Sequence, residues 1–130
     1  VSAAGIAMLL GASPKTVLSL APKSVTTPVA MGIAERIGGL PSLTATLVIA
    51  TGMIGAMIAA PLLNLVRVRG HDARGFALGV ASHGIGTARA FHMSEEMGAF
   101  SGLAMGLAAL LTALLVPMLA GWAGLLSPGT

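Results

Sequence analysis

Two short polar stretches of this 130-residue chain carry the side chains most able to bind a ligand. The first, residues 22–28, places a positive charge and three hydroxyls between two prolines, on Lys23, Ser24, Thr26 and Thr27. Thr27 can serve as a helix N-cap, and Pro28 suits the first helical position because its missing N–H is harmless there. The unpaired N–H groups and positive dipole end of such a helix predict a site for a small anion. The alternative is an interfacial loop in which Lys23 extends to the lipid headgroups.

The second stretch, residues 81–89, repeats this pattern with glycines. Gly84 and Gly86 permit a tight turn and Thr87 can cap a following helix, so we expect a second helix N-terminus here. His83 has the chemistry to bind a carboxylate or to carry a proton, and a packing or hydrogen-bonding role within the protein is the alternative. The predicted substrate-binding residues of the two stretches are Lys23, Ser24, Thr26, Thr27, Ser82, His83, Gly84, Gly86, Thr87 and Arg89.

Other groups of polar residues do not indicate catalysis. Glu95 and Glu96 are adjacent, so on a helix they diverge by about 100°; we interpret them as an interface, with an ion-coupling acid as the alternative. The three histidines follow no zinc pattern, and no Ser-His-Asp order, metalloprotease motif or phosphate-binding loop is present. The four aromatic residues do not interleave with a basic patch. We therefore expect neither an enzyme nor a metal, a cofactor or a nucleic-acid partner.

The composition indicates which kind of element holds these stretches in place. Hydrophobic residues make up 55% of the chain and charged residues 8%, whereas a soluble domain carries about 25% charged residues. The mean hydropathy is +0.94, which excludes a disordered chain as well as a soluble globular surface. The 18 glycines suit closely packed membrane helices. The lipid bilayer is therefore the expected solvent of this protein.

Two charge-free blocks, residues 37–66 and 97–130, are each long enough for one membrane-spanning helix, which needs about 20 apolar residues. We place these two helices at residues 43–66 and 99–122. The block 1–14 is too short for a complete span, and the chain opens without Met and without a signal-peptide pattern. We therefore expect a fragment that begins inside a larger protein.

The intervening segments, residues 12–39 and 72–98, each have apolar arms of about ten residues on either side of a polar break. Ten helical residues rise about 15 Å, which is half of the hydrocarbon core of a bilayer. Pro and Gly interrupt a helix, and the freed backbone groups then need protein or water as partners. The predicted fold is thus an all-α, polytopic integral membrane protein with two full transmembrane helices and two broken or re-entrant helical segments.

These elements form a weak internal repeat, with units at about residues 12–66 and 72–126. The pairs that match at an offset of 60 residues include Thr27 with Thr87, Glu35 with Glu95, and Gly38 with Gly98. If the broken segments are re-entrant hairpins, the units are inverted and the two breaks meet near the bilayer midplane. If the segments cross the bilayer, the units are parallel. The short arms favour hairpins.

Two further patterns concern orientation and packing. The three arginines of residues 67–74 form the densest basic cluster of the chain. By the positive-inside rule they predict a cytoplasmic loop. Gly98, Gly102 and Gly106 recur every fourth residue and predict a packing face on the last helix. The partner of that face lies either within the chain or in another subunit.

Several longer motifs carry a resemblance to a known family. They are LAPKSVTTPVA at 20–30, GLPSLTA at 39–45, ARGFALG at 73–79, ASHGIGTAR at 81–89 and EEMGAFS at 95–101. With these motifs the chain closely resembles the LrgB/CidB family of holin/antiholin-like membrane proteins, over nearly all of its length. Members of that family are considerably longer. The resemblance therefore implies that residues 1–130 are a single LrgB-like membrane domain that corresponds to their C-terminal portion.

The resemblance implies one of two functions. The first is a carrier of small carboxylates such as glycolate, glycerate or pyruvate, because the plastidial glycolate/glycerate translocator contains an LrgB-like part. The second is a holin/antiholin-like regulator of murein hydrolase activity and cell lysis, which acts with a small LrgA/CidA-type membrane protein or as a homo-oligomer. The implied location is the bacterial inner membrane, or the plastid envelope in a plant. Paired helix breaks favour the carrier, since secondary transporters bind anions in this way.

Overall fold

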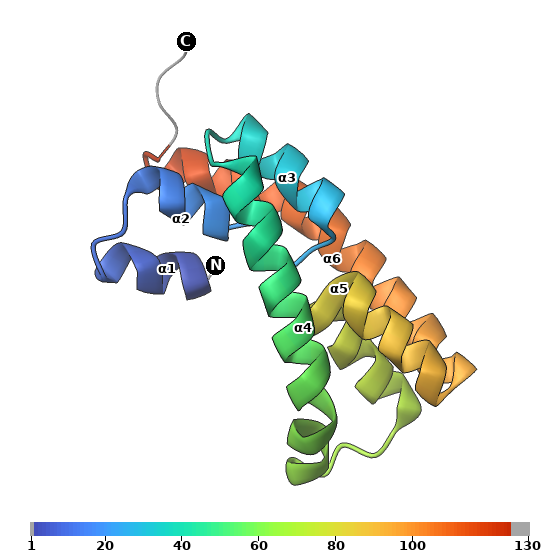
Figure 1. Cartoon of the computed structure of the whole chain (residues 1–130). Coiled ribbons are helices and arrows are strands. Elements are labelled where there is room, and N and C mark those ends of the chain that lie inside the picture. Colours follow the sequence, from blue (N-terminus) through green and yellow to red (C-terminus); the bar gives the residue numbers. More distant parts are fainter. Residues whose placement is uncertain (1, 126–130) are drawn as a thin grey trace.

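The computed structural model describes residues 2–125, and all regular elements in that range are helices (Figure 1). In chain order they are α1 (Ser2–Leu9), α2 (Pro14–Leu20), α3 (Thr27–Arg36), α4 (Pro41–Leu65), α5 (His71–Met93) and α6 (Glu95–Trp122). The prediction of an all-helical fold is confirmed over this range. Leu126–Thr130, at the end of the second charge-free block, lie outside the described residues.

The two predicted spans correspond to α4 and α6, which have 25 and 28 residues. By length and composition, both are long enough and apolar enough to cross a membrane. α6 begins four residues earlier than the predicted position 99 because Ser94 caps it: the Ser94 hydroxyl oxygen accepts a hydrogen bond from the Met97 N–H at 3.0 Å. Glu95 and Glu96 then occupy the first turn, where the helix dipole favours negative charge.

Buried apolar side chains form three clusters along α4 and α6. At one end, α2 and α3 meet the end of α6 through Leu18, Ile33, Ile37, Val116 and Ala120. At the other end, α4 and the start of α6 enclose α5 through Ala59, Leu78, Ala90 and Met97. Between them, Val25, Ala30 and Val48 pack together. α4 and α6 therefore run in broadly opposite directions, with the two broken segments at opposite ends (Figure 1).

α5 folds back on itself and is not a straight helix. Its 23 residues would be about 33 Å long if the helix continued without interruption. Instead, the Nδ1 atom of His71, its first residue, lies 3.6 Å from a carboxylate oxygen of Glu96, just after its end. Leu78 and Ala90 share one buried cluster. α5 is thus a helical hairpin with arms at residues 71–82 and 84–93, which Figure 1 shows beside α4 and α6.

The first broken segment is arranged differently, because α2 packs on α1 and α4 and makes few contacts with α3. α2 ends at Leu20 and α3 begins at Thr27, and Leu18 packs against Ile33 near the end of α3. A buried serine fastens this end to α4. The Ser19 hydroxyl accepts the Leu40 N–H at 2.7 Å, and the Thr44 hydroxyl donates to the Ser19 carbonyl oxygen at 2.9 Å. The turn between α2 and α3 therefore projects toward the middle cluster.

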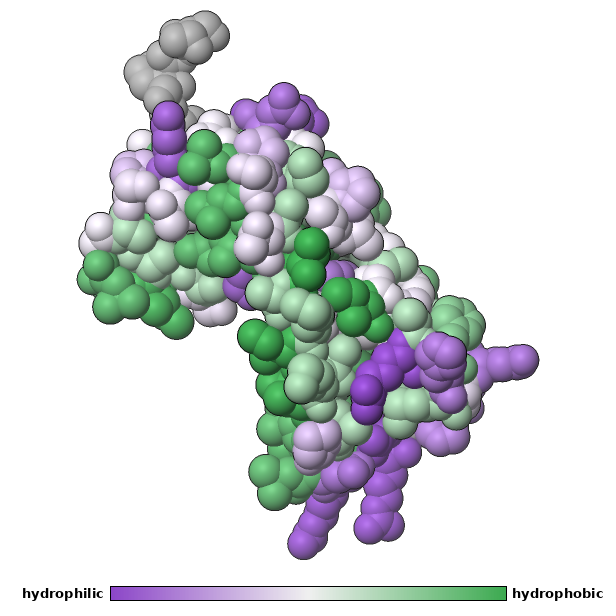
Figure 2. All heavy atoms as spheres, in the orientation of Figure 1, coloured by the Kyte–Doolittle hydropathy of each residue, from purple (hydrophilic) through white to green (hydrophobic). Residues whose placement is uncertain are grey.

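The surface is apolar between two polar ends. Figure 2 shows hydrophilic residues gathered at opposite ends of the visible face and a mostly apolar surface between them. Large side chains point outward along both long helices, including Met57 of α4, 71% exposed, and Leu110 of α6, 59% exposed. An apolar surface of this extent is unusual for a protein in water. It suits contact with lipid or with another protein.

Candidate functional site

The first break is an open turn at residues 21–26, and its capping differs from the prediction. Thr26, not Thr27, is the N-cap of α3, and Pro28 is the second helical residue. The Thr26 hydroxyl makes no capping hydrogen bond. The helix begins one residue earlier because φ and ψ of Thr27 are already helical, and Pro28 is tolerated throughout the first turn. The Ala30 N–H donates to the Thr26 carbonyl oxygen and Pro28 has no N–H, so Thr27 and Val29 are the residues of this first helical turn whose N–H groups no side chain caps. Thr27 has no capping role.

The second break lies at one residue, His83, and not at the two predicted glycines. His83 has φ 40° and ψ −127°, a conformation that favours glycine, while the residues on either side are helical. Such a backbone costs about 1–3 kcal/mol and persists only where surrounding contacts enforce it. The prediction that the turn uses the freedom of Gly84 and Gly86 was wrong. Gly86 serves close packing instead, because a Cβ atom there would overlap the Leu78 carbonyl oxygen of the opposite arm.

Contacts with α4 hold His83 in this conformation. The ring is buried, with 3% of the residue exposed, and Nε2 donates to the Val48 carbonyl oxygen at 3.0 Å. Because a carbonyl oxygen only accepts, Nε2 carries the proton and Nδ1 is the nitrogen left to bind another one. Gly52, one turn further along α4, is in contact with the same ring and leaves no room for a Cβ atom. The middle of α4 is therefore shaped around this histidine.

Of the two hydroxyls near His83, that of Thr87 is hydrogen-bonded within residues 2–125 and that of Ser82 is not. Thr87 donates to the His83 carbonyl oxygen at 2.8 Å and pairs with the Ser101 hydroxyl of α6 at 2.9 Å. The prediction that Thr87 caps the second arm was therefore wrong. Thr87 lies within this arm and connects it to α6. Ser82 is fully buried against Gly55 of α4, and its hydroxyl has no hydrogen-bond partner among the described residues. A buried polar group without a protein partner is rare.

The two breaks converge on Val48. Val25, in the first break, belongs to one buried cluster with Ala30 and Val48. His83, the second break, is hydrogen-bonded to the Val48 carbonyl oxygen. Lys23, two residues before Val25 in the first break, is half-buried. Residues about 60 positions apart in the sequence thus meet at one point along α4. Positive charge, hydroxyls and the start of α3 are gathered there.

Not every predicted site residue belongs to this meeting point. Ser24 and Gly84 are exposed at the two turns, and no neighbour lies within 4 Å of a Cβ atom built on Gly84. Arg89 is exposed on the second arm, six residues beyond the break, where it lines a separate groove. The other predicted site residues lie within four positions of Val25 or His83, which meet at Val48; they are Lys23, Thr26, Thr27, Ser82, Gly86 and Thr87.

The predicted glycine face of α6 is used only at its first position. Phe91 fills the space at Gly98, whereas Gly102 and Gly106 have no neighbour within 4 Å of a Cβ position. Packing within the described residues follows a different stripe of α6, through Met97, Ser101 and Ala104. Within residues 2–125, nothing packs against these two glycines.

Four residues of the site were missed from sequence. They are Val48, Gly52, Gly55 and Ser101, which contact His83, Ser82 or Thr87. The sequence does indicate part of this set. A buried stripe of α4 is formed by residues that recur every fourth position, namely Thr44, Val48, Gly52 and Ala56. Such a small-residue stripe predicts close helix packing. It does not reveal that a carbonyl group is the partner of the histidine.

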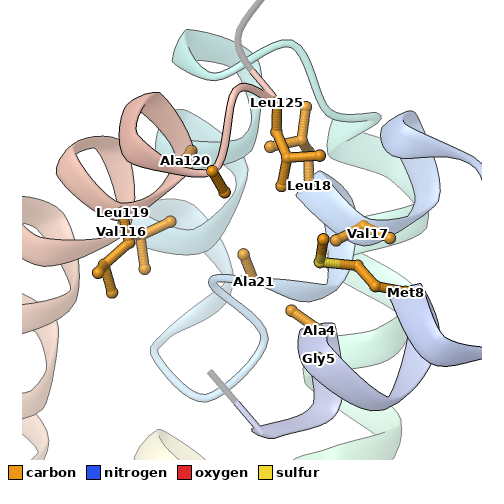
Figure 3. Close-up of a pocket in the computed structure, with 11 residues that line it drawn as sticks. Ala4, Gly5, Met8, Val17, Leu18, Ala21, Val116, Leu119, Ala120 and Leu125 are labelled. Atoms are coloured by element: carbon orange, nitrogen blue, oxygen red, sulfur yellow. The ribbon is translucent and has the colours of Figure 1, made fainter.

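A cavity of about 160 Å³ lies elsewhere, among α1, α2 and the end of α6 (Figure 3). Its lining is apolar, with Met8, Leu18 and Val116 among the side chains that point into it. It offers no group that recognises an anion. Within residues 2–125, no three histidine or acidic side chains gather in a way that could hold a metal ion.

Comparison with known proteins gives matches over most of the chain. The profile of the LrgB-like family matches residues 1–122. The chain is 41% identical over 119 residues to the protein YwbG of Bacillus subtilis, covering 92% of this chain and 53% of that protein. It is 36% identical to the holin-like protein CidB of Staphylococcus epidermidis, over 85% of this chain and 48% of that protein. The holin-like protein CidB of Staphylococcus aureus is 37% identical, over 84% of this chain and 48% of its own length. The chain thus spans about half the length of these curated relatives, and no solved structure matches it.

Proposed function

The chain belongs to the LrgB-like family, and on that premise we propose that it is part of a multi-pass membrane carrier of small carboxylates. In this proposal α4 and α6 cross the bilayer, while the α2–α3 pair and the α5 hairpin are re-entrant segments that form an inverted repeat. The observation that carries the proposal is the contact of both helix breaks with Val48. Two re-entrant breaks that meet inside a bilayer form the kind of midplane site that secondary transporters use.

The chemistry at this point favours an anion. The first turn of α3 offers N–H groups that no side chain caps, and Lys23 adds a full positive charge beside them. The start of the second α5 arm, after His83, offers a second set of N–H groups. A carboxylate accepts hydrogen bonds from both sets and from the nearby hydroxyls. Because water is scarce at membrane depth, each of these charge-assisted bonds is stronger than at a protein surface.

Two costly features support a binding role over simple packing. The His83 backbone is strained, and the Ser82 hydroxyl is buried without a partner. Both lower the stability of the empty protein, by about 1–3 kcal/mol each. A hairpin needed only for packing gains nothing from either feature. A site that has to release its substrate does, since partly unsatisfied groups are completed only while the substrate is bound.

The second candidate function is a holin-like regulator of lysis, which the names of the relatives favour. Two of these relatives are called holin-like protein CidB. A holin-like role needs assembly in the membrane and no defined substrate site. It would use the outward apolar faces of α4 and α6, including the open glycines Gly102 and Gly106. A small LrgA/CidA-type protein or a second copy would be its partner.

For location, we propose the bacterial inner membrane with the loop between α4 and α5 in the cytoplasm. Arg67, Arg69 and Arg74 are at this end, and the relatives come from bacteria. A cysteine introduced by Gly70→Cys should resist an impermeant thiol reagent added to intact cells and react once the membrane is opened. Labelling from outside intact cells would contradict this orientation.

The test of the carrier is exchange across liposomes that contain the full-length protein. Vesicles loaded with unlabelled pyruvate should take up labelled pyruvate, glycolate or glycerate in a saturable manner, and protein-free vesicles should not. A holin-like pore would instead release an entrapped neutral sugar together with the carboxylate. Absence of saturable exchange for all three carboxylates, with the protein shown to be folded, would reject the carrier and favour the regulator.

A further inference from the structure

We propose that the groove between α4 and the second arm of α5 binds an anionic phospholipid of the surrounding bilayer. The groove has a volume of about 670 Å³ and is open to the outside. Its lining residues are Met53, Ala56 and Met57 from α4 and Ile85, Arg89, His92 and Met93 from α5. The lipid site rests on the membrane insertion and orientation proposed above, but not on carboxylate transport.

The groove has one apolar side and one basic side. Met53 and Met57 are 49% and 71% exposed, so their flexible side chains are presented to the surroundings and not to the core. Methionine adapts its shape to irregular apolar partners such as an acyl chain. On the other side, Arg89 and His92 lie three residues apart on one face of the arm, with Ile85 one turn before Arg89. This arrangement is that of an amphiphile with a negatively charged head.

The charge of Arg89 needs a partner that the described residues do not supply. Over residues 2–125, the ion pair that the structure contains joins His71 to Glu96 and leaves Arg89 without a carboxylate. The planar guanidinium presents a fork of N–H donors that matches a phosphate group. A buried carboxylate substrate is a poorer candidate for this place, since Arg89 is exposed on the outside of the hairpin and is separated from His83 by six residues.

The depth of the groove also fits a headgroup. Arg89 precedes the end of its arm at Met93 by four residues, about 6 Å of helical rise. Because α5 folds back, this end lies on the same side as Arg67, Arg69 and Arg74. On the proposed cytoplasmic side, anionic lipids are enriched and basic pockets between helices attract them. The head then lies at Arg89 while an acyl chain extends along Met57 and Met53 toward the midplane.

Retention of phosphatidylglycerol tests this inference. The full-length protein is assembled in nanodiscs of phosphatidylglycerol and phosphatidylcholine, extracted in mild detergent without any carboxylate, and its bound lipids are counted by native mass spectrometry. We expect phosphatidylglycerol to be retained over phosphatidylcholine, and Arg89→Gln to weaken that retention at least about tenfold. Arg69→Gln, which removes the same charge from the exposed loop, should leave it unchanged.

Two results would overturn the inference. Equal retention in the wild type and Arg89→Gln would show that the groove does not hold the headgroup, and equal loss in both arginine variants would show diffuse attraction to the basic end. Arg89→Lys provides a second variant if Arg89→Gln fails to fold. It keeps the charge but not the planar fork, so a specific phosphate site predicts an intermediate loss. Displacement of phosphatidylglycerol by pyruvate would assign the groove to the transport path instead.

Discussion

The break between α2 and α3 takes six residues, 21–26, whereas the break inside α5 takes one, His83. The first is open: Ser24 is exposed, and the Thr26 hydroxyl makes no capping bond. The second is closed: His83 and Thr87 are buried, and their side chains are bonded to Val48 and Ser101. Polar side chains are thus left free in the first break, whereas the histidine and threonine of the second are committed to structure. The first break is suited to supply most of the binding groups, while the buried His83 and Thr87 of the second fix where the two breaks meet.

The helices around the two breaks also differ in how tightly they pack: the α5 hairpin is packed closely and α3 more loosely. In the α5 hairpin, Gly75 and Gly79 bring the first arm against backbone carbonyl groups of Met97 and Ser101 in α6, with no room for a Cβ atom. On α3, Gly32 has no neighbour within 4 Å of its Cβ position. A bulky residue should therefore destabilise the protein at Gly79 and be tolerated at Gly32.

The largest expected effect comes from Gly79→Leu. The new side chain meets the Ser101 carbonyl oxygen, which cannot move without bending α6, so we expect a loss of about 3 kcal/mol or more. The matched change Gly32→Leu has open space and replaces a poor helix former, so it should keep or raise stability. Size-exclusion profiles and thermal unfolding midpoints in detergent provide the measurement. Similar behaviour of the two variants would show that the hairpin is not the rigid region.

The next largest effect is expected at Lys23, in the open break. Lys23→Ala should lower carboxylate uptake about ten- to a hundred-fold, because a charge-assisted hydrogen bond to the substrate is lost, while Lys23→Arg keeps part of it. Lys15→Ala removes the same charge from the exposed start of α2 and should have no effect. Uptake kinetics in liposomes at matched protein density give the comparison. Unchanged uptake in Lys23→Ala would mean that this side chain only reaches for headgroups.

A smaller effect on stability is expected at His83, where two substitutions distinguish the cost of the strained backbone from the loss of a hydrogen bond. Both His83→Gly and His83→Ala lose the bond to Val48, but only glycine adopts a φ of 40° without strain. His83→Gly should therefore be about 1 kcal/mol more stable than His83→Ala. At Ser24, where the described backbone has no positive φ, the Gly and Ala variants should have similar unfolding midpoints. A His83→Ala protein as stable as His83→Gly would contradict the strained reversal.

The smallest expected effect is a gain in stability. Ser82→Ala removes a buried hydroxyl that has no partner, so the free energy of unfolding should rise by about 1 kcal/mol, while the affinity for the carboxylate falls. Ser24→Ala removes an exposed hydroxyl and should leave the free energy of unfolding unchanged. Thermal unfolding with and without pyruvate measures both quantities. A loss of stability in Ser82→Ala would show that the hydroxyl is satisfied in the empty protein.

Sequence patterns were sufficient for the long helices and for the position of the breaks within a few residues. Charge-free blocks locate α4 and α6 because each block is long enough and apolar enough to form one membrane-spanning helix. The polar stretches locate both turns, since Pro and small polar residues interrupt apolar helices. The family was also evident, because its motifs extend over both breaks.

The exact position of the second turn and the partners of its side chains could not be predicted from local sequence, because they depend on residues far along the chain. The glycines at 84 and 86 suggested a turn, but the turn fell on His83 because Val48 and Gly52, more than 30 residues away, hold its ring. Thr87 looked like a cap, but Ser101 of α6 provides its partner. Arg89 was grouped with the site by its position in the sequence, although a helical face turns it outward into a groove. Local residue type predicts where a chain can turn, and tertiary contacts decide where it does.

The central claim is that the two breaks form one anion site, and ligand protection tests it most directly. The 130 residues contain no cysteine, so reaction rates with a small thiol reagent can be followed at introduced cysteines. Ser24→Cys and Gly84→Cys place them at the exposed edges of the two breaks, next to Lys23 and His83, and Gly70→Cys is the control outside the breaks. We expect one carboxylate, for example pyruvate, to slow the reaction at both positions 24 and 84 with the same half-maximal concentration, and to leave position 70 unaffected. Protection at only one break, or at neither while the variants still transport, would contradict a shared site.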